Sequence, residues 1–143
     1  MTAPMGLYAV TRPRILVCED DPEVAQLIGM MLDKGGFDAD MAHTAAQARD
    51  CLHMASYAAM TVDIKLPYEN GLKLIRELRQ EKRTADLPVL VLSVTAEEAR
   101  LHADHHALAI SDWLEKPLDE RRLLDCLRRA TKNSRASQGA ESV

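Results

Sequence analysis

The chain contains few aromatic residues and few cysteines. It has one Trp, one Phe and three Tyr in 143 residues, so Leu, Val, Ile, Ala and Met must fill the interior. The three cysteines, Cys18, Cys51 and Cys126, are an odd number and lack the spacing of a metal site. The sequence therefore does not indicate a disulfide framework, and we expect buried free thiols in a reducing cytoplasm.

The sequence also lacks a long hydrophobic run and a large excess of one charge. No apolar stretch approaches the roughly 18 residues of a membrane span, and the N-terminus has no signal-peptide core. The net charge of -4 gives no electrostatic argument for nucleic-acid binding. We therefore expect no membrane insertion and no direct contact with nucleic acid. The length is that of about one globular domain.

Short apolar runs alternate with segments of helical period. The predicted strands are Arg14–Cys18, Phe37–Met41, Tyr57–Val62, Val89–Leu92 and Asp112–Leu114. The predicted helices follow the caps Asp21, Thr44, Asn70 and Asp119, and one more covers about Ala96–Leu108. Because parallel strands need helical crossovers, this alternation predicts an α/β fold with helices on both faces of the sheet. We expect a flexible segment at 1–13, one domain at 14–131 and a disordered tail at 132–143.

Polar side chains stand where several predicted strands end. These residues are Glu19, Asp20, Asp63, Ser93 and Lys116. Because the carboxyl ends of parallel strands share one edge of a sheet, three carboxylates, a hydroxyl and an ammonium should lie together. Such a set suits a divalent cation beside a phosphoryl group, and hard oxygen ligands favour Mg²⁺.

Each of these side chains has an expected role. Asp63 is the predicted nucleophile, since a carboxylate can form an acyl phosphate when a metal neutralises the incoming oxygens. The turn after Asp63 lets the backbone carbonyl of Lys65 face the metal. Ser93 can donate a hydrogen bond to one phosphoryl oxygen, and Lys116 can pair with another. Pro117 indicates a special geometry of the Lys116–Pro117 bond, with cis as the candidate, that aims the ammonium inward.

With these residues in place, the chain resembles the receiver domain of two-component response regulators over roughly Arg14 to Thr131. The motifs that carry the resemblance are Glu19-Asp20, Asp63-x-x-Leu66-Pro67-x-x-x-Gly71, Ser93 and Lys116-Pro117. The resemblance implies a flavodoxin-like (βα)5 fold, a doubly wound parallel sheet with strand order 2-1-3-4-5. It also implies Mg²⁺-dependent transfer of a phosphoryl group to Asp63 from a phosphohistidine of a sensor histidine kinase or phosphotransfer protein.

The resemblance also implies a switch formed by Ser93 and Trp113. Ser93 would move toward the phosphoryl group, and Trp113 would turn inward into the vacated space. The face built by the fourth helix, fifth strand and fifth helix would then be remodelled for a partner. Plain edge packing is the alternative for Trp113. In the family the position of Lys65 tunes attack by water, so we expect Lys65 to lengthen the lifetime of the acyl phosphate.

The site residues are consistent with three functions. The first is a signalling switch whose only chemistry is self-phosphorylation and slow autodephosphorylation. The second is a phosphatase or phosphotransferase acting on a small molecule, but such enzymes usually carry a second Asp where this chain has Lys65. The third is an interaction module that is never phosphorylated, which the full set of site residues argues against.

Several features leave alternatives open. No output domain follows the last helix, so we expect either a stand-alone regulator or the receiver of a hybrid sensor kinase. His102, His105 and His106 are interpreted as surface residues of a helix, because no ligand at useful spacing completes a metal site. The arginines of the last helix are interpreted as a solvated face, with pairing across a homodimer as the alternative. The cognate kinase, the downstream effector and the oligomeric state stay open.

Overall fold

The computed structural model describes residues 11–94 and 108–141, with side chains up to Lys132. Five parallel strands form one sheet in the order β2-β1-β3-β4-β5, which confirms the predicted strand order. The strands are β1 (Arg14–Cys18), β2 (Asp38–Ala42), β3 (Ala59–Asp63), β4 (Val89–Ser93) and β5 (Asp112–Glu115). The helices within the described residues are α2 (Pro22–Lys34), α3 (Ala45–Met54), α4 (Gly71–Gln80) and α6 (Glu120–Glu141).

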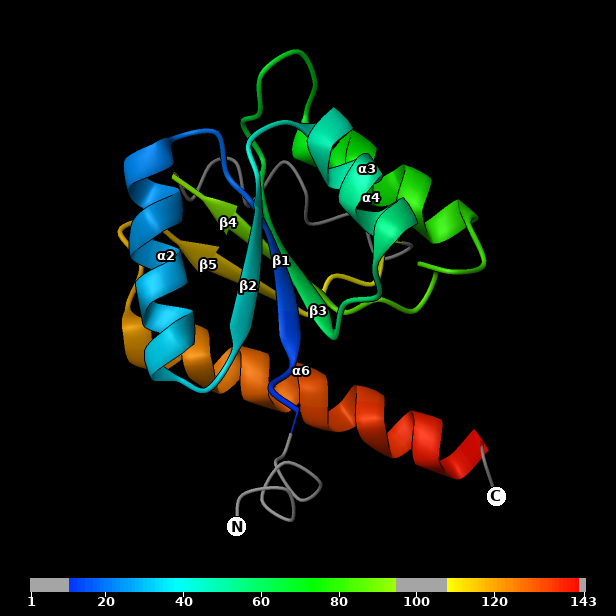
Figure 1. Ribbon diagram of the computed structural model, residues 1–143. Coiled ribbons are helices and arrows are strands. Elements are labelled where there is room, and N and C mark those ends of the chain that lie inside the picture. The colour runs from blue at the N-terminus through cyan, green and yellow to red at the C-terminus, as the bar shows by residue number, and fades with distance from the viewer. Residues whose placement is uncertain (1–10, 95–107, 142–143) are drawn as a thin grey trace, which may run out of the picture.

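Helices cover both faces of the sheet, as predicted. In Figure 1, α3 and α4 lie on one side, and α2 and α6 lie on the other. The two faces carry separate hydrophobic cores. On the α3 and α4 side the largest buried side chains include Leu16, Met60 and Ile75. On the α2 and α6 side they include Ile28 and Leu123. Aliphatic residues thus fill the interior of a chain poor in aromatics.

Each described helix begins after a capping side chain. The capping residues are Asp21, Thr44, Asn70 and Asp119, and each accepts a hydrogen bond from a backbone N–H in the following turn. Such bonds satisfy amide groups that have no partner inside the helix. Pro22 stands in the first turn of α2, where its missing N–H costs nothing. All four predicted caps are confirmed.

The structure describes part of each segment that flanks the expected domain. Arg12 lies in the segment expected to be flexible, yet its guanidinium donates to Asp33 Oδ1 at 3.0 Å and to the Phe37 carbonyl at 2.8 Å. Residues 1–10 lie outside the described residues. Helix α6 continues to Glu141, so the backbone of the expected disordered tail is helical up to that residue. The tail has no Pro, and its Lys, Arg, Ala, Gln and Glu residues are good helix formers.

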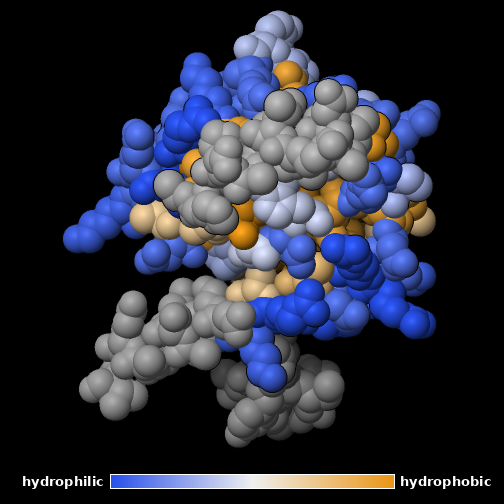
Figure 2. Space-filling view, turned by 180° about the vertical axis from the view of Figure 1, so that it is seen from behind, coloured by the Kyte–Doolittle hydropathy of each residue, from blue (hydrophilic) through white to orange (hydrophobic). Residues whose placement is uncertain are grey.

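Polar residues cover much of the face of the molecule seen in Figure 2. On the face shown in Figure 2, hydrophilic residues occupy most of the periphery and hydrophobic residues gather toward the middle. Among the described helices, none has the length and apolar character that a bilayer crossing requires. The three cysteines are free, as predicted, but Cys51 is only partly buried, whereas Cys18 and Cys126 are buried. Apart from Leu108, the helix predicted at 96–108, with its three histidines, lies outside the described residues.

Candidate functional site

The acidic residues predicted to meet at the sheet edge do so. Glu19 follows β1, and Asp63 is the last residue of the neighbouring strand β3. Carboxylate oxygens of Glu19, Asp20 and Asp63 all lie within 4.8 Å of one another. Asp20 is exposed, whereas the other two residues are buried. One exposed and two buried carboxylates form a cluster with a side open to solvent.

Lys116 reaches this cluster from the loop after β5. Its Nζ lies 2.5 Å from Glu19 Oε1 and 2.7 Å from Asp63 Oδ2. The side chains are 17% exposed for Lys116, 1% for Glu19 and 6% for Asp63, so water screens these charges weakly. A buried carboxylate is costly without a compensating charge. The ammonium supplies that charge to both groups, and the Lys116–Pro117 peptide bond is cis.

Burial and the charges of the site shift the pKa values of three groups at this edge of the sheet. Burial, together with the nearby Asp63 carboxylate, raises the pKa of Glu19 to about 7, against the opposing hydrogen bond from Lys116. The pKa of Lys116 is raised by its hydrogen bonds to Asp63 and Glu19, which outweigh the effect of its burial. Burial, with the repulsion of the carboxylates, raises the pKa of the Cys18 thiol to about 12. The shifts of Glu19 and Cys18 favour their neutral forms, and the shift of Lys116 favours its charged form beside the two carboxylates.

Backbone contacts fix the Asp63 carboxylate and the loop that follows it. The N–H of Lys65 donates to Asp63 Oδ1 at 3.0 Å, so both carboxylate oxygens of Asp63 have donors. The N–H of Gly71 donates to the Ile64 carbonyl at 2.8 Å, and Lys65 and Asn70 form an antiparallel bridge. A Cβ atom on residue 71 would collide with the backbone oxygen of Asp63. Glycine at this position therefore permits the tight return of the loop.

Ser93 and Trp113 occupy the positions expected from the strand register. Ser93 is buried at the end of β4, and its carbonyl accepts a hydrogen bond from the Lys116 N–H at 2.7 Å. Trp113 pairs with Val91 in the sheet and packs, partly buried, against the core on the α3 and α4 side. Ser93 thus lies one strand from Asp63, and Trp113 lies on the edge strand beyond it.

Sequence reasoning missed one residue that supports the site. His43 follows β2, and its Nδ1 lies 3.0 Å from the backbone oxygen of Glu19. The Glu19 N–H in turn donates to the Ala42 carbonyl at 2.9 Å. The segment after β2 therefore holds the backbone of a buried carboxylate. The position of His43 directly after a predicted strand, at the same edge as the other site residues, was the available signal.

Comparison with known proteins agrees with this geometry. Residues 15–128 match the response regulator receiver domain family. A sensor protein from Polaromonas sp. JS666 has a solved structure that is 53% identical, with a TM-score of 0.81, and the match covers 86% of this chain and 98% of that one. Response regulator MprA from Mycobacterium avium is 32% identical over 130 residues, which are 91% of this chain and 56% of MprA.

A third relative was solved with a metal. The receiver domain of sensor histidine kinase PA1611 from Pseudomonas aeruginosa PAO1 has a magnesium ion coordinated in its active site cleft. It is 26% identical, with a TM-score of 0.74, over 85% of this chain and 99% of that one. The chain spans about half the length of the curated relatives it matches. The chain belongs to the receiver domain family of two-component response regulators, whose members are phosphoacceptor signalling switches.

Proposed function

We propose that Asp63 accepts the phosphoryl group, from a phosphohistidine of a sensor histidine kinase or of a phosphotransfer protein. The observation that supports this choice is the position of the Asp63 carboxylate. It is buried, lies among the carboxylates of Glu19 and Asp20, and accepts a hydrogen bond from Lys116 at 2.7 Å. A cytoplasmic location, where the three thiols stay reduced, agrees with this partner class.

Glu19, Asp20 and Asp63, with the backbone carbonyl of Lys65, are the proposed ligands of Mg²⁺. Their donors are hard oxygens, the type that Mg²⁺ prefers, and the exposed Asp20 leaves room for bound water. Three carboxylates lie close together there, and two of them share the Lys116 ammonium, which supports the binding of an added cation. When bound, the ion supplies charge that offsets the phosphoryl oxygens.

The remaining chemistry belongs to side chains of this chain. A carboxylate oxygen of Asp63 attacks phosphorus, a P–O bond forms, and the P–N bond breaks with its electron pair left on the imidazole. Lys116 offsets the charge of the incoming phosphoryl oxygens, because its Nζ already contacts Asp63 Oδ2. Ser93 donates a hydrogen bond to another of these oxygens. Water later cleaves the acyl phosphate and regenerates the Asp63 carboxylate.

The proposed output is a change of packing around Ser93 and Trp113. Ser93 is buried and Trp113 is partly buried, so a phosphoryl group that draws the Ser93 hydroxyl toward it changes the space available to the indole. The face affected includes β5 and α6, and its expected third part lies, apart from Leu108, outside the described residues. The two states differ in their affinity for a partner.

Intact mass spectrometry after incubation with phosphoramidate and Mg²⁺ tests the proposal. The wild type should gain one phosphoryl group, whereas Asp63→Asn and a wild-type sample in EDTA should gain none. An adduct that persists in Asp63→Asn would refute the assignment of the phosphoacceptor. Multiple turnovers of a generic phosphomonoester would instead favour the small-molecule phosphatase.

A further inference from the structure

The guanidinium of Arg49 joins α3, α4 and the loop that follows Asp63, residues 64–70. Its two terminal nitrogens donate to the two carboxylate oxygens of Glu69, at 2.8 and 2.7 Å. Its Nε donates to Glu77 Oε2, on α4, at 2.9 Å. A planar fork that bonds both oxygens of a carboxylate fixes direction as well as distance. The Glu69 side chain is only 18% exposed, so this pair is shielded from solvent.

Glu69 is the point at which this loop is attached to α3. The residue before it, Tyr68, has a φ of 73° in the left-handed region, which costs a residue with a Cβ about 1–2 kcal/mol. Tyr68 is 99% exposed, so packing of its own side chain does not offset that cost. The Arg49–Glu69 pair one residue later restrains the backbone instead. The pKa of Glu69 is lowered, chiefly by its hydrogen bonds from Arg49, as expected for a tight pair.

The same loop contacts the phosphoacceptor. Its ends are closed by the Lys65–Asn70 bridge and by the Gly71 N–H bond to the Ile64 carbonyl. Inside that closure, the Lys65 N–H donates to Asp63 Oδ1. A displacement of the loop at Glu69 therefore moves the amide that orients the Asp63 carboxylate. The proposed metal ligand at the Lys65 carbonyl belongs to the same peptide segment.

We propose that Arg49 is a positioning residue for phosphoryl transfer, which acts by holding Glu69 and thereby the loop 64–70 against α3. The inference rests on the proposed function of Asp63. It assigns a role to an ion pair that lies outside the carboxylate cluster and that the receiver motifs quoted above do not include.

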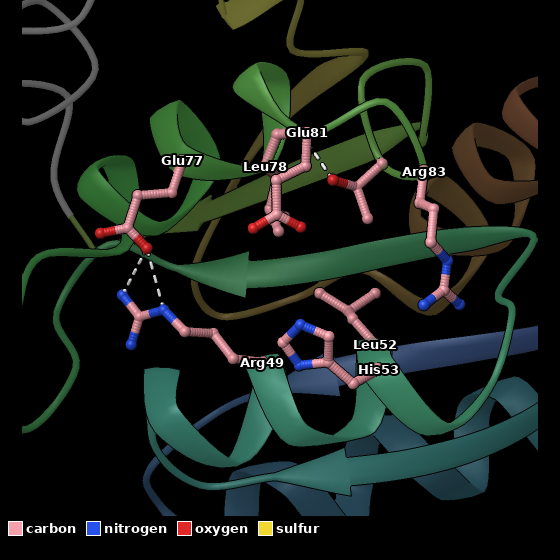
Figure 3. Close-up of a pocket in the computed structure, with 8 residues that line it drawn as sticks. Arg49, Leu52, His53, Glu77, Leu78, Glu81 and Arg83 are labelled. Carbon is pink, nitrogen blue, oxygen red and sulfur yellow. Dashed lines mark hydrogen bonds and ion pairs between the residues drawn. The ribbon is translucent and has the colours of Figure 1, made fainter.

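Glu77 provides a matched control within the same interaction. Figure 3 shows Arg49 extending from α3 to Glu77 of α4 across a pocket also lined by Leu52, His53, Leu78 and Glu81. Glu77 bonds the same guanidinium but belongs to a helix and not to the loop, and its side chain is 42% exposed. Loss of the Glu77 carboxylate leaves both bonds between Arg49 and Glu69 available.

The experiment compares Arg49→Gln, Glu69→Gln and Glu77→Gln with the wild type. The rate of adduct formation from phosphoramidate and the Kd for Mg²⁺ are measured for each, and the Lys65 amide resonance is followed by ¹⁵N–¹H NMR. We expect Arg49→Gln and Glu69→Gln to slow phosphorylation roughly tenfold, because misplaced reacting groups lose rate steeply. Both variants should also shift the Lys65 amide resonance. The phosphorylation rate of Glu77→Gln should stay within about twofold of the wild-type rate.

The outcomes separate this inference from the proposed function. A wild type that forms no adduct refutes the function itself. An active wild type with unchanged rates in Arg49→Gln and Glu69→Gln refutes the positioning role. Equal slowing in all three variants also refutes it, since that pattern reflects a general loss of stability. If Arg49→Gln does not fold, the near-isosteric variant Glu69→Gln tests the positioning role in its place. An unchanged Lys65 amide resonance in Glu69→Gln would then contradict the proposal.

Discussion

The ammonium of Lys116 lies between two buried carboxylates, 2.7 Å from Asp63 Oδ2 and 2.5 Å from Glu19 Oε1. The three residues come from the ends of three different strands and are far apart in the chain. The positive charge that the site needs is thus supplied by a side chain before any metal binds. We therefore expect the stability of the domain to depend on both Lys116 and the proposed metal.

We predict that Lys116→Met lowers the free energy of unfolding by about 1–3 kcal/mol in EDTA, because two buried carboxylates lose their common partner. Saturating Mg²⁺ should recover more stability in the variant than it adds to the wild type. Urea unfolding with and without Mg²⁺ measures both quantities. Lys34→Met, at a lysine that is 70% exposed, is the control and should change little. An Mg²⁺ effect equal in variant and wild type would contradict the prediction.

Gly71→Ala should damage both stability and phosphorylation. The added Cβ would press on the Asp63 carbonyl oxygen and lie 2.9 Å from Val62 Cγ1, and the backbone cannot yield cheaply. We expect a loss of about 1–3 kcal/mol in the free energy of unfolding and slower adduct formation from phosphoramidate. Gly29→Ala is the control, because its Cβ would meet only the flexible end of Met41, at 2.7 Å. Equal behaviour of the two variants would refute this reading.

Thr61→Val should stabilise the domain. The Thr61 hydroxyl is buried in β3 and has no hydrogen-bond partner within the part of the chain that the structure describes. Removing an unsatisfied buried hydroxyl should raise the free energy of unfolding by about 1 kcal/mol. Thr84→Val should have the opposite effect, because the Thr84 hydroxyl donates to the Leu78 carbonyl at 2.6 Å. Thermal unfolding of both variants measures these two stability changes. A destabilised Thr61→Val would contradict the prediction.

Tyr57→Phe should reveal an alkaline pH dependence of stability. The Tyr57 hydroxyl donates to Asp40 Oδ2 at 2.7 Å, and burial together with this carboxylate raises the pKa of the phenol. The folded protein thus holds the phenolic proton more tightly than the unfolded chain. The stabilisation is complete below the unfolded pKa of about 10 and is lost as the pH rises above it. The stability difference between wild type and Tyr57→Phe should therefore shrink above that pH in urea titrations.

Lys65→Ala should shorten the lifetime of the acyl phosphate several-fold. Lys65 is the second residue after Asp63, and we expect its ammonium to shield the phosphoryl group from water. The decay of the adduct after removal of phosphoramidate, followed by intact mass, measures the lifetime. Lys73→Ala, on α4, serves as a control for the loss of one positive charge. An unchanged decay rate in Lys65→Ala would show that this side chain does not protect the phosphoryl group.

Much of this architecture could be predicted because local and global signals agree. Caps such as Asp21 and Asn70 mark helix starts, and the fully buried strands β3 and β4 read as continuous apolar runs. The edge that collects Asp63 and Lys116 then follows from the parallel topology alone.

Other features could not be predicted, because they depend on side-chain reach across the fold. The Arg49–Glu69 pair joins residues on two separate elements, and nothing local distinguishes either from a solvated surface charge. Arg79 is a similar case, because its guanidinium donates hydrogen bonds to the carbonyls of Leu87 and Leu108. The hydrophobic periodicity of the sequence does not indicate these bonds. The backbone of α6 is helical beyond residue 132, although the polar composition of that segment favoured disorder over a longer helix.

Strand β2 lies at one edge of the sheet, and its first and third residues are paired with arginines. Arg12 Nε lies 3.3 Å from Asp38 Oδ1, and Arg14 donates to Asp40 Oδ1 at 2.9 Å. The exposed backbone of an edge strand can recruit strands from other molecules. Charged side chains on an edge strand make the addition of a further strand less favourable, so we expect Asp38 and Asp40 to lower the tendency of β2 to recruit another chain.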